Sequence, residues 1–377
     1  MRVAFNARLL YDPTLRGWNR YTVNLIAELL SLGIEAFLYT DRPLHNDHLD
    51  RLSSGNRQVR VAPPMRYVWW EHRWLPHQCR TDGVELLHCP FNFGLPAFSH
   101  CPRVLTLHDA IGQGSGIEFR RGQILPRLYH WIARKRAHHI IAPSHHAKRE
   151  ITTRLGIAAP KVTVIHEAAD FRFHQPTVPA TIEHVRMRHG LSRPFVFYVG
   201  GWEKRKNLPF LLRAFAAAKE TTIDLALAGQ ADETTRVALL ELATALGIGS
   251  QLRLLGRISD EDLAALYGSA LCFVYPSVDE GFGLQLCEAM AAGCPVLAAN
   301  KTSLPEVLGT GGELFEVADP RVLGNLIRRV ALDLGYRQEL VRRASNRSTD
   351  FSWRSAAAQT MEVYQRLLSS GQNEPRQ

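Results

Sequence analysis

The second half of the chain contains a segment whose residue types suit the binding of a phosphorylated ligand. An apolar strand-like run, Cys272–Tyr275, precedes a glycine loop, and a helical pattern over Gln285–Ala292 follows it. The loop and the residue that opens the helix are Glu280, Gly281, Phe282, Gly283 and Leu284. A strand, a glycine loop and a helix in this order favour anion binding, because glycines let a ligand approach the backbone and the first helix amides are unpaired. The sequence therefore predicts a site that fits a diphosphate.

Two carboxylates, Glu280 and Glu288, flank this predicted anion site. A carboxylate repels a phosphate, so their expected partners are sugar hydroxyls, which can donate a pair of hydrogen bonds to an ionised carboxylate. The alternative is that both side chains only cap the helix or face solvent. The residue types alone leave both interpretations open.

A basic segment follows another strand-like run, Phe195–Val199. It places Arg205 and Lys206 directly before Asn207, at the start of a helical pattern over Leu208–Ala218. Asn207 is expected to cap that helix, and a neighbouring guanidinium and ammonium can neutralise a departing diphosphate. A basic loop by itself also fits a solvated surface. The two segments together favour ligand binding, because both follow strands of one predicted domain.

Short apolar runs alternate with longer helical patterns along the chain, which is typical of βαβ units and parallel sheets. The strands expected in the first half are Val3–Ala7, Ala36–Tyr39, Leu86–His88, Val104–His108 and His139–Pro143. The strands expected in the second half are Phe195–Val199, Leu225–Ala228, Leu252–Leu254, Cys272–Tyr275 and Val296–Ala298. This pattern predicts an α/β protein with two Rossmann-like doubly wound domains. Such sheets bind ligands at the carboxyl ends of their strands, so the two domains are expected to face each other across an inter-domain cleft.

The domain boundaries follow from the same pattern. The first domain is predicted over 1–175 and the second over 194–350. Between them the polar stretch 176–193 is interpreted as a linker. The last segment, 351–377, is expected to form a helix that crosses back to the first domain, followed by a frayed tail from residue 369.

Composition narrows the class of protein. The 377 residues include 46% hydrophobic residues, without a run of the ~18–20 apolar residues that span a bilayer or a signal-peptide pattern, so we expect a cytoplasmic protein. The six cysteines form no C-x-x-C pair, which indicates buried, reduced residues rather than a zinc site or disulfides. The formal charge of +9 indicates an anionic partner. Because no nucleic-acid module accompanies the charge, we expect no nucleic acid among the partners.

The spacing of Glu280 and Glu288, with Gly-Phe-Gly between them, resembles the retaining glycosyltransferases of the GT-B fold, specifically family four. Further matching segments are Arg205 to Asn207, Gly256 to Asp260, and Ser303 to Val307. The resemblance is tight over 195–310 and looser before 170. It implies that the first domain binds the acceptor and that the second binds a nucleotide sugar.

The resemblance implies a role for each matching residue of the second domain. Arg205 and Lys206 would bind the donor phosphates, aided by the amides of the glycine loop. Glu288 would hold the ribose, and Glu280 would contact the donor hexose. The loop residues expected to lie along the donor are Gly281, Phe282, Gly283 and Leu284.

In the first domain, His108 and Asp109 resemble the family's strand-end pair that faces the transferred sugar. An imidazole there could hydrogen-bond the sugar or the departing oxygen, whereas an isolated histidine at a strand end is commonly a satisfied structural residue. The family's first glycine loop is replaced by Gly17, Trp18 and Asn19. We expect Asn19 to keep a left-handed turn and, with Gly17, to lie on the acceptor side. Trp18 would either stack on an acceptor sugar or staple the following helix.

The reaction implied by the resemblance moves a hexose from a nucleoside diphosphate to an acceptor hydroxyl with retention. Mannose from GDP-mannose is the first expectation, with UDP- and dTDP-hexoses as alternatives, and no further cofactor is expected. The chain lacks an Asp-x-Asp motif, so we expect no metal and assign leaving-group stabilisation to Arg205 and Lys206. The alternatives are a GT-B-fold epimerase or phosphorylase, and a non-catalytic nucleotide-sugar-binding subunit of a polysaccharide assembly complex.

The expected acceptor is a saccharide or a lipid-linked glycan. Residues 120–139 contain six Arg or Lys and no acid on a helical pattern, with Tyr129 and Trp131 among them. Such a helix can rest on anionic lipid at the inner face of a membrane, or it can be an ordinary solvated helix face.

Overall fold

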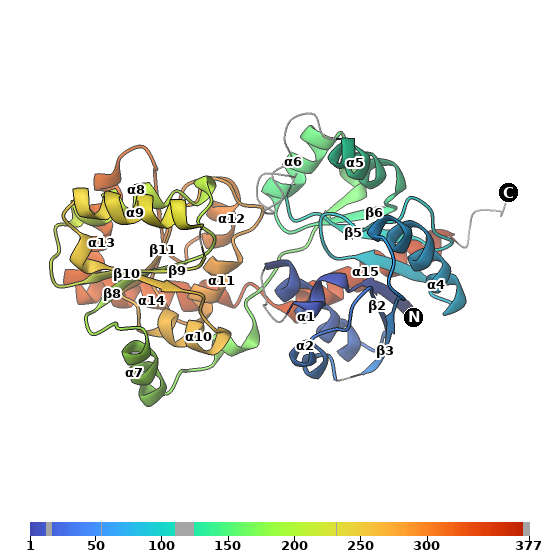
Figure 1. Cartoon of the computed structure of the whole chain (residues 1–377), viewed down its shortest axis with the longest axis horizontal. Helices are drawn as coiled ribbons and strands as arrows, with labels where there is room; N and C mark the ends of the chain where they lie inside the picture. Colours follow the sequence, from blue (N-terminus) through green and yellow to red (C-terminus); the bar gives the residue numbers. More distant parts are fainter. Residues whose placement is uncertain (13–16, 54, 110–123, 231, 372–377) are drawn as a thin grey trace. The chain divides into compact units, whose positions relative to one another are not determined.

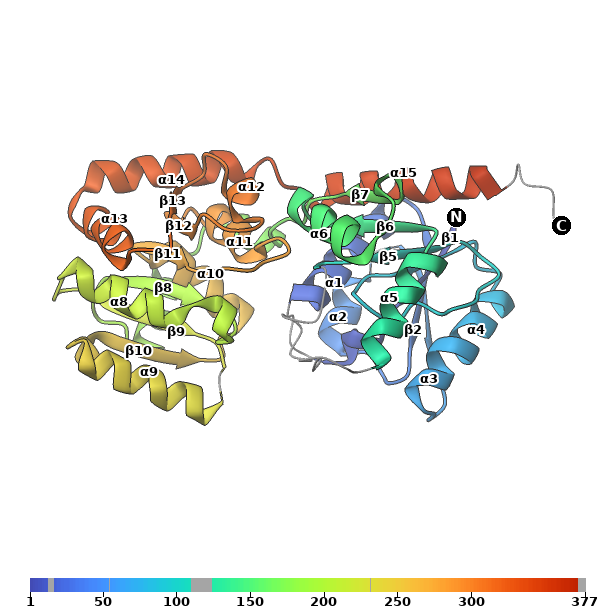
Figure 2. The ribbon, with the colours of Figure 1, turned by 90° about the horizontal axis from the view of Figure 1, so that it is seen from above.

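The computed structural model describes residues 1–12, 17–53, 55–109, 124–230 and 232–371. The chain divides into two compact units, the first made of Met1–Glu167 with Ser352–Gln377 and the second of Ala168–Phe351. Each unit is built on one parallel sheet with helices on both faces, as Figures 1 and 2 show. The prediction of two doubly wound α/β domains is confirmed.

Within its described residues, the first unit forms a seven-stranded sheet in the order β3-β2-β1-β4-β5-β6-β7, in which every pair is parallel. The strands are β1 (Arg2–Asn6), β2 (Glu35–Thr40), β3 (Asn56–Val61), β4 (Leu86–Cys89), β5 (Arg103–Thr106), β6 (His139–Ala142) and β7 (Val162–Val164). The helical segments are η1 (Arg8–Tyr11), α1 (Gly17–Ser31), α2 (Asn46–Arg51), α3 (Tyr67–Trp69), η2 (Trp70–Trp74), α4 (Leu75–Thr81), α5 (Ile124–Arg136), α6 (His145–Leu155), η3 (Ala159–Lys161) and α15 (Trp353–Gly371). In Figure 1, α5 and α6 cover one face of this sheet, and α1 and α2 cover the other.

The second unit, described except for residue 231, forms a six-stranded sheet in the order β10-β9-β8-β11-β12-β13, again with parallel pairs. The strands are β8 (Phe195–Val199), β9 (Asp224–Ala228), β10 (Leu252–Gly256), β11 (Cys272–Tyr275), β12 (Val296–Ala299) and β13 (Glu313–Phe315). The helical segments are η4 (Phe171–His174), α7 (Pro179–Arg188), η5 (Lys204–Lys206), α8 (Leu208–Ala218), α9 (Glu233–Ala245), η6 (Gly249–Gln251), α10 (Asp260–Ser269), α11 (Leu284–Ala291), α12 (Leu304–Leu308), α13 (Pro320–Leu332) and α14 (Leu334–Ser348). Figure 1 shows α8 and α9 on one face of the sheet and α7 and α10 on the other.

The predicted linker, 176–193, belongs to the second unit instead. Its helix α7 packs against α10, where Arg188 forms an ion pair with Asp262 at 3.0 Å and His189 Nε2 lies 2.9 Å from Asp262 Oδ2. Val185 and Leu191 of the same stretch are buried. The polar composition of this stretch therefore reflects a solvated helix, and the division between the units follows Glu167 rather than residue 175.

The last helix, α15, belongs to the first unit, where it packs against α1. Trp353 lies edge-on to Tyr21 of α1, and the hydroxyl of Tyr364 lies 2.6 Å from Nδ1 of His88. The helix continues through Gly371, so the start of the predicted frayed tail at residue 369 is wrong. Residues 372–377 of that tail lie outside the described residues.

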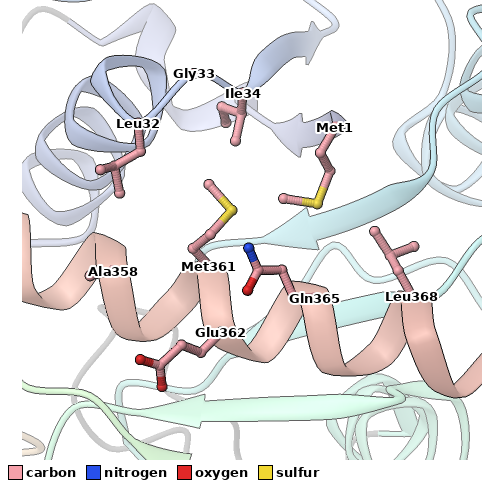
Figure 3. A pocket seen from close by; sticks show the side chains of 9 residues that line it. All are labelled: Met1, Leu32, Gly33, Ile34, Ala358, Met361, Glu362, Gln365 and Leu368. Carbon is pink, nitrogen blue, oxygen red and sulfur yellow. The ribbon is translucent and has the colours of Figure 1, made fainter.

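An open hollow of about 650 Å³ lies between α15 and the start of the first sheet (Figure 3). Its lining combines apolar side chains with two polar ones from α15, Glu362 and Gln365. Met1 and Ile34 line it and directly precede β1 and β2. The hollow is therefore at the amino ends of these strands, whereas doubly wound sheets bind their ligands at the carboxyl ends.

The six cysteines agree with the expectation from the sequence. All six cysteines are unpaired and buried, as predicted. Within the residues that the structure describes, no helix is both long and apolar enough to cross a bilayer.

The first unit buries a carboxylate, Glu71, on the π-helical segment η2. The side chain is inaccessible to solvent, and one oxygen accepts a hydrogen bond from Tyr129 at 3.1 Å. Within the part of the chain that the structure describes, the other oxygen has no hydrogen-bond partner. Burial raises the pKa of Glu71 from 4.5 to about 7, against the opposing effect of tyrosine hydroxyls and Arg8. The folded unit therefore holds a proton on Glu71 over a pH range in which the unfolded chain has lost it.

We expect Glu71→Gln to stabilise the protein in a pH-dependent manner. A raised carboxylate pKa means that the native state binds more protons, so wild-type stability falls as the pH rises from 4.5 through 7. The penalty is roughly 3 kcal/mol well above pH 7. Glutamine is neutral throughout, so the variant should gain roughly 2–3 kcal/mol in urea unfolding at pH 8 and little at pH 4.5. The control is Glu362→Gln, an exposed carboxylate of the same unit. An equal gain at both pH values would contradict the assignment.

Candidate functional site

The polar site of the second unit lies where the sheet changes direction. Strands β8 and β11 are neighbours in the sheet although β9 and β10 lie between them in sequence, and this is the switch point of a doubly wound sheet. The loop after β8 carries Arg205 and Lys206, and the loop after β11 carries Glu280. Both strands are apolar runs that form because parallel strands are covered on both faces. The sheet thereby brings together two loops that are about 75 residues apart.

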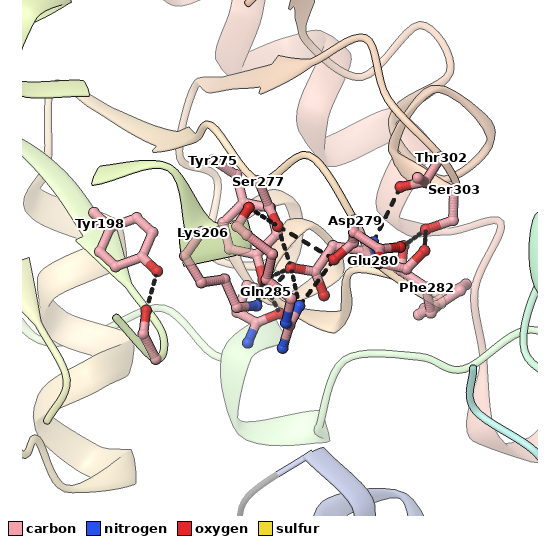
Figure 4. A network of polar contacts seen from close by, with 12 residues as sticks. Tyr198, Lys206, Tyr275, Ser277, Asp279, Glu280, Phe282, Gln285, Thr302 and Ser303 are labelled. Carbon is pink, nitrogen blue, oxygen red and sulfur yellow. Dashed lines mark hydrogen bonds and ion pairs between the residues drawn. The ribbon is translucent and has the colours of Figure 1, made fainter. Parts of the chain in front are cut away.

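One oxygen of Glu280 collects the polar groups of this site (Figure 4). Its Oε1 lies 2.5 Å from Lys206 Nζ and 3.0 Å from Arg205 Nη1. Two hydroxyls also donate to Oε1, those of Ser277 at 2.6 Å and Tyr275 at 3.0 Å. Lys206 Nζ in turn donates to the Tyr275 hydroxyl at 2.7 Å. The prediction gave Glu280 sugar hydroxyls as partners and did not include a contact with the two cations, whereas the structure pairs Glu280 with both of them.

The charges of this cluster stabilise one another. Burial lowers the pKa of Lys206, and Glu280 acts against that shift. Burial would raise the pKa of Glu280, but Lys206 and Arg205 outweigh it and hold the pKa below its ordinary value. Burial opposes the charge of Arg205 too, yet the Glu280 carboxylate raises the pKa of its guanidinium. Glu280 and Arg205 are therefore ionised near neutral pH, and the 2.5 Å contact with the Glu280 carboxylate favours the charged form of Lys206.

Backbone contacts hold the loops after β8 and β11 together. The Val278 amide donates to the Arg205 carbonyl at 2.8 Å, and Arg205 Nη1 donates to the Asp279 carbonyl at 2.9 Å. Asn207 follows in a left-handed conformation with φ of 55° and makes no capping hydrogen bond through its side chain. The predicted side-chain cap is wrong, and asparagine is present because it tolerates this backbone conformation.

Helix α11 begins directly after the glycine loop. Gly283 has φ of 101°, and a Cβ there would lie 2.7 Å from Leu304 Cδ2, so only glycine fits. The amides that open α11 at Leu284 have no acceptor within the helix, which makes this terminus suited to an anion. Gly281 is partly exposed and Phe282 is buried, with its ring edge-on to Phe351. The segment thus has the predicted order of strand, glycine loop and helix.

Glu288 lies on α11 with 3% of its surface exposed. The hydroxyl of Tyr267, from α10, donates to its Oε2 at 3.2 Å. A carboxylate this buried is not the solvated helix residue that the alternative interpretation described.

In the first unit, His108 follows β5 and is 7% exposed. Its Nδ1 lies 2.9 Å from Glu167 Oε1, and its Nε2 lies 3.0 Å from the Pro90 carbonyl oxygen. A carbonyl can only accept, so the contact with Pro90 needs a proton on Nε2. Both nitrogens are thus engaged with the protein, and a ligand could reach one of them only by exchanging one of these contacts.

Aromatic rings and an amide surround His108. Trp18 stacks on the imidazole at 6.0 Å between centroids, and Tyr21 lies edge-on to it at 4.7 Å. The Asn92 side chain accepts from the His108 amide at 2.7 Å and donates to Asp109 Oδ1 at 2.7 Å. Trp18 therefore packs on the histidine, and Asn92, which sequence reasoning did not single out, fixes the predicted pair.

The expected glycine-type turn at Gly17 and Asn19 is wrong. Both residues belong to helix α1, which begins at Gly17, and Asn19 is among the buried residues of that helix. Its Nδ2 donates to the Leu9 carbonyl at 3.1 Å. Asn19 has no positive φ, so the asparagine connects α1 to the segment after β1 rather than forming a left-handed turn.

Sequence reasoning missed Tyr275, Ser277 and Thr302, which complete the site around Glu280. Tyr275 was counted only as a strand residue, and its position at the carboxyl end of β11 was the signal that could have identified it. Among the described residues, no group of three or more His, Cys, Asp or Glu side chains is arranged to hold a metal ion.

Both sheets have the strand order of nucleotide-binding folds, and the second has a cationic site at its switch point. The chain is therefore in the class of proteins with two Rossmann-like α/β domains. In structure, the chain is similar to Anabaena Alr3699/HepE in complex with UDP and glucose, with a TM-score of 0.79, 19% identity, and coverage of 97% of this chain and 100% of that one. It is also similar to WaaG, a glycosyltransferase involved in lipopolysaccharide biosynthesis, with a TM-score of 0.71, 17% identity, and coverage of 96% and 99%. The fold is GT-B, as predicted.

Sequence comparisons assign the chain to a family. The model for glycosyl transferases group 1 matches residues 182–347, and the model for glycosyltransferase family 4 matches residues 15–173. The chain is 30% identical over 308 residues to O-antigen chain mannosyltransferase B of Escherichia coli, covering 78% of this chain and 72% of that protein. It is 32% identical over 243 residues to the serotype-specific mannosyltransferase WbdA of Escherichia coli, covering 63% of this chain but only 30% of WbdA. The chain belongs to the family 4 glycosyltransferases of group 1.

Proposed function

We propose that the chain is a hexosyltransferase that moves a hexose from a nucleoside-diphosphate sugar to an acceptor hydroxyl with retention at the anomeric carbon. The observation that carries this proposal is the cluster of Arg205, Lys206 and Glu280 at the switch point of the second sheet. The cluster brings two basic side chains together in the loops that precede α11, and cations together with helix amides stabilise a departing diphosphate.

Within this proposal, Arg205 and Lys206 bind the diphosphate, with the amides of Gly283 and Leu284. Glu288 holds the ribose. Glu280 pairs with the cations and also contacts the hexose. Its Oε1 accepts the hydrogen bonds from the protein, and its Oε2 is available to accept one from a hexose hydroxyl. The other loop residues, Gly281 and Phe282, line the donor. No metal and no further cofactor is needed, since the two cations supply the positive charge.

The first candidate donor is GDP-mannose, and the acceptor is a saccharide or a lipid-linked glycan. Relatives are named as mannosyltransferases, among them the MMP alpha-(1->4)-mannosyltransferase of Mycolicibacterium hassiacum. UDP-hexoses are the second candidates, because HepE was solved with UDP and glucose. In the reaction, the bond from the anomeric carbon to phosphate breaks and the bond to the acceptor oxygen forms on the same face. The departing phosphate oxygen takes the acceptor proton.

The first unit supplies the sugar-side residues in this proposal. His108 exchanges its contact with the Pro90 carbonyl for one with the transferred sugar, while Nδ1 keeps its contact with Glu167. Asp109, with Gly17 and Asn19 of α1, lies on the acceptor side. Trp18 holds the imidazole in place through ring stacking.

A peripheral membrane contact through 120–139 is a further part of the proposal. Only part of this segment is described, and there Trp131 is 45% exposed, with the Arg136 guanidinium 5.3 Å from its ring centroid. An exposed tryptophan beside arginines suits the interface of an anionic bilayer. Sedimentation with anionic vesicles, compared with neutral ones, tests the contact.

A donor screen followed by turnover measurements tests the proposed function. GDP, UDP and dTDP and their hexose derivatives are compared by thermal shift, where a ligand at ~100 times its Kd adds ~2.7 kcal/mol. His108→Ala is then expected to lower kcat roughly 100-fold or more, with a smaller change in nucleotide affinity. Turnover with donor alone would indicate an epimerase, a need for phosphate a phosphorylase, and binding without any turnover a non-catalytic subunit. A protein that binds none of these nucleotides would refute the proposal.

A further inference from the structure

Thr302 has an unusual backbone conformation for its residue type. It follows β12 and has φ of 52°, in the left-handed region. Glycine, asparagine and aspartate adopt this region readily, whereas a β-branched residue there is an outlier because its side chain crowds the backbone. A threonine in this place therefore indicates that its side chain makes a contact that glycine could not make.

The Thr302 side chain holds the backbone of Glu280. Its Oγ1 accepts a hydrogen bond from the Glu280 amide at 3.1 Å (Figure 4). The next residue, Ser303, is fully buried, and its hydroxyl lies 2.9 Å from the Glu280 carbonyl oxygen and 2.8 Å from that of Phe282. Two consecutive residues after β12 thus fix the amide and the carbonyl of the residue that pairs both cations.

The segment that contains Thr302 is itself anchored to the sheet. The Asn300 amide donates to the Phe315 carbonyl at the end of β13 at 2.8 Å, and the Leu304 amide donates to the Lys301 carbonyl at 3.0 Å. Leu304 also contacts the backbone at Gly283, where a Cβ would lie 2.7 Å from its Cδ2. The position of the Glu280 backbone is therefore set by the loop after β12.

We propose that Thr302 is a positioning residue of the donor site. Its hydroxyl fixes the Glu280 amide so that the carboxylate meets Lys206 and Arg205 with one oxygen and leaves the other for the ligand. The strained backbone of Thr302 is retained because of this contact. The proposal deepens the proposed function and rests on it for the nature of the ligand.

The competing explanation is a tight turn that happens to contain threonine. In that case glycine would serve equally well, because it adopts a φ of 52° without strain. The two explanations differ in the properties of Thr302→Gly, which removes both the strain and the hydroxyl. Thr302→Val keeps the branch and removes the hydroxyl, and Thr302→Ser keeps the hydroxyl without the branch.

The experiment combines amide hydrogen exchange of Glu280, read from overlapping peptides, with calorimetric affinities for GDP and UDP. Thr302→Ser is expected to match the wild type. In Thr302→Val and Thr302→Gly, the Glu280 amide hydrogen should exchange with solvent faster than in the wild type. Both variants should bind the nucleotide roughly five- to tenfold more weakly. Thr302→Gly should nevertheless melt at or above the wild-type temperature, because the strain is gone.

Each outcome has a defined meaning. If the Glu280 amide exchanges at the same rate in all variants, Thr302 does not fix that amide. If the amide exchanges faster but the nucleotide affinity is unchanged, Thr302 has no role in donor binding. If the wild type binds neither nucleotide, the donor assignment fails, while the exchange data, which need no ligand, still decide whether Thr302 fixes Glu280. A parallel loss of melting temperature and affinity in Thr302→Gly would make the residue merely structural.

Discussion

Lys206→Ala is expected to weaken the affinity for the nucleoside diphosphate by roughly 100-fold or more. Lys206 is 4% exposed and its Nζ lies 2.5 Å from Glu280 Oε1, so its charge acts through a poorly solvated medium. Removing one partner of such a pair costs about 2–5 kcal/mol in binding, because a ligand charge then loses its partner and Glu280 is compensated by Arg205 alone. Calorimetric titration with GDP and UDP measures the effect.

The matched control is Lys204→Ala. Lys204 is part of the same short helical turn and is exposed, so a charge lost there should change affinity only a few-fold. Lys206→Ala should also lower the stability of the second unit, since it breaks a buried ion pair. Binding must therefore be measured below the melting temperature of the variant. Equal effects of the two substitutions on affinity would remove Lys206 from the diphosphate site.

Glu280→Gln is expected to move binding and turnover in opposite directions. Glutamine keeps the shape of the side chain but leaves Arg205 and Lys206 without a compensating charge. The stronger positive potential should tighten nucleoside-diphosphate binding roughly tenfold, because unit charges at these separations interact by a few kcal/mol near a protein surface. Turnover should fall roughly 100- to 1000-fold, since the proposed acceptor of the hexose hydroxyl and the placement of Lys206 are both impaired.

Initial rates and calorimetry on the same preparation separate the two effects of Glu280→Gln. Glu203→Gln is the control, because Glu203 precedes the same turn but is exposed. A variant that loses affinity and turnover in parallel would show that Glu280 serves the fold of the loop, and its charge would then have no separate part in the reaction.

The sequence predicted the central elements of the second unit with accurate bounds. The strands β8 and β11 and the helix α8 begin and end at the predicted residues. Strands covered on both faces must be apolar throughout, so their pattern is strong in the sequence. The edge strand β3 was missed because its NRQVRV sequence is partly exposed, and β7 and β13, of three residues each, are too short to form a pattern.

Arg205, Lys206 and Glu280 lie in loops that directly follow strands, where the sequence placed them, but the sequence did not predict their contacts with one another. The strand order that makes β8 a neighbour of β11 is what pairs Lys206 with Glu280, and such long-range pairing leaves no local trace in the sequence. Thr302 could not be found either, because its importance comes from a backbone angle that threonine normally avoids. Asn19 was misplaced because glycine-like residues near a helix start fit both a turn and the first helical turn.

Helix α15 belongs to the first unit but is synthesised after the whole of the second unit. The first unit is therefore the last to be completed during translation. Tyr364, which pairs with His88, leaves the ribosome about 200 residues after Glu167, a delay on the order of 10–40 s. Residues 168–351 are fully available before that, so the second unit can fold first. Until translation ends, the face of α1 that α15 covers is exposed to water and to other nascent chains. A protein truncated before residue 352 would retain that exposed face permanently, which makes aggregation rather than simple loss of activity the expected fate of such truncations.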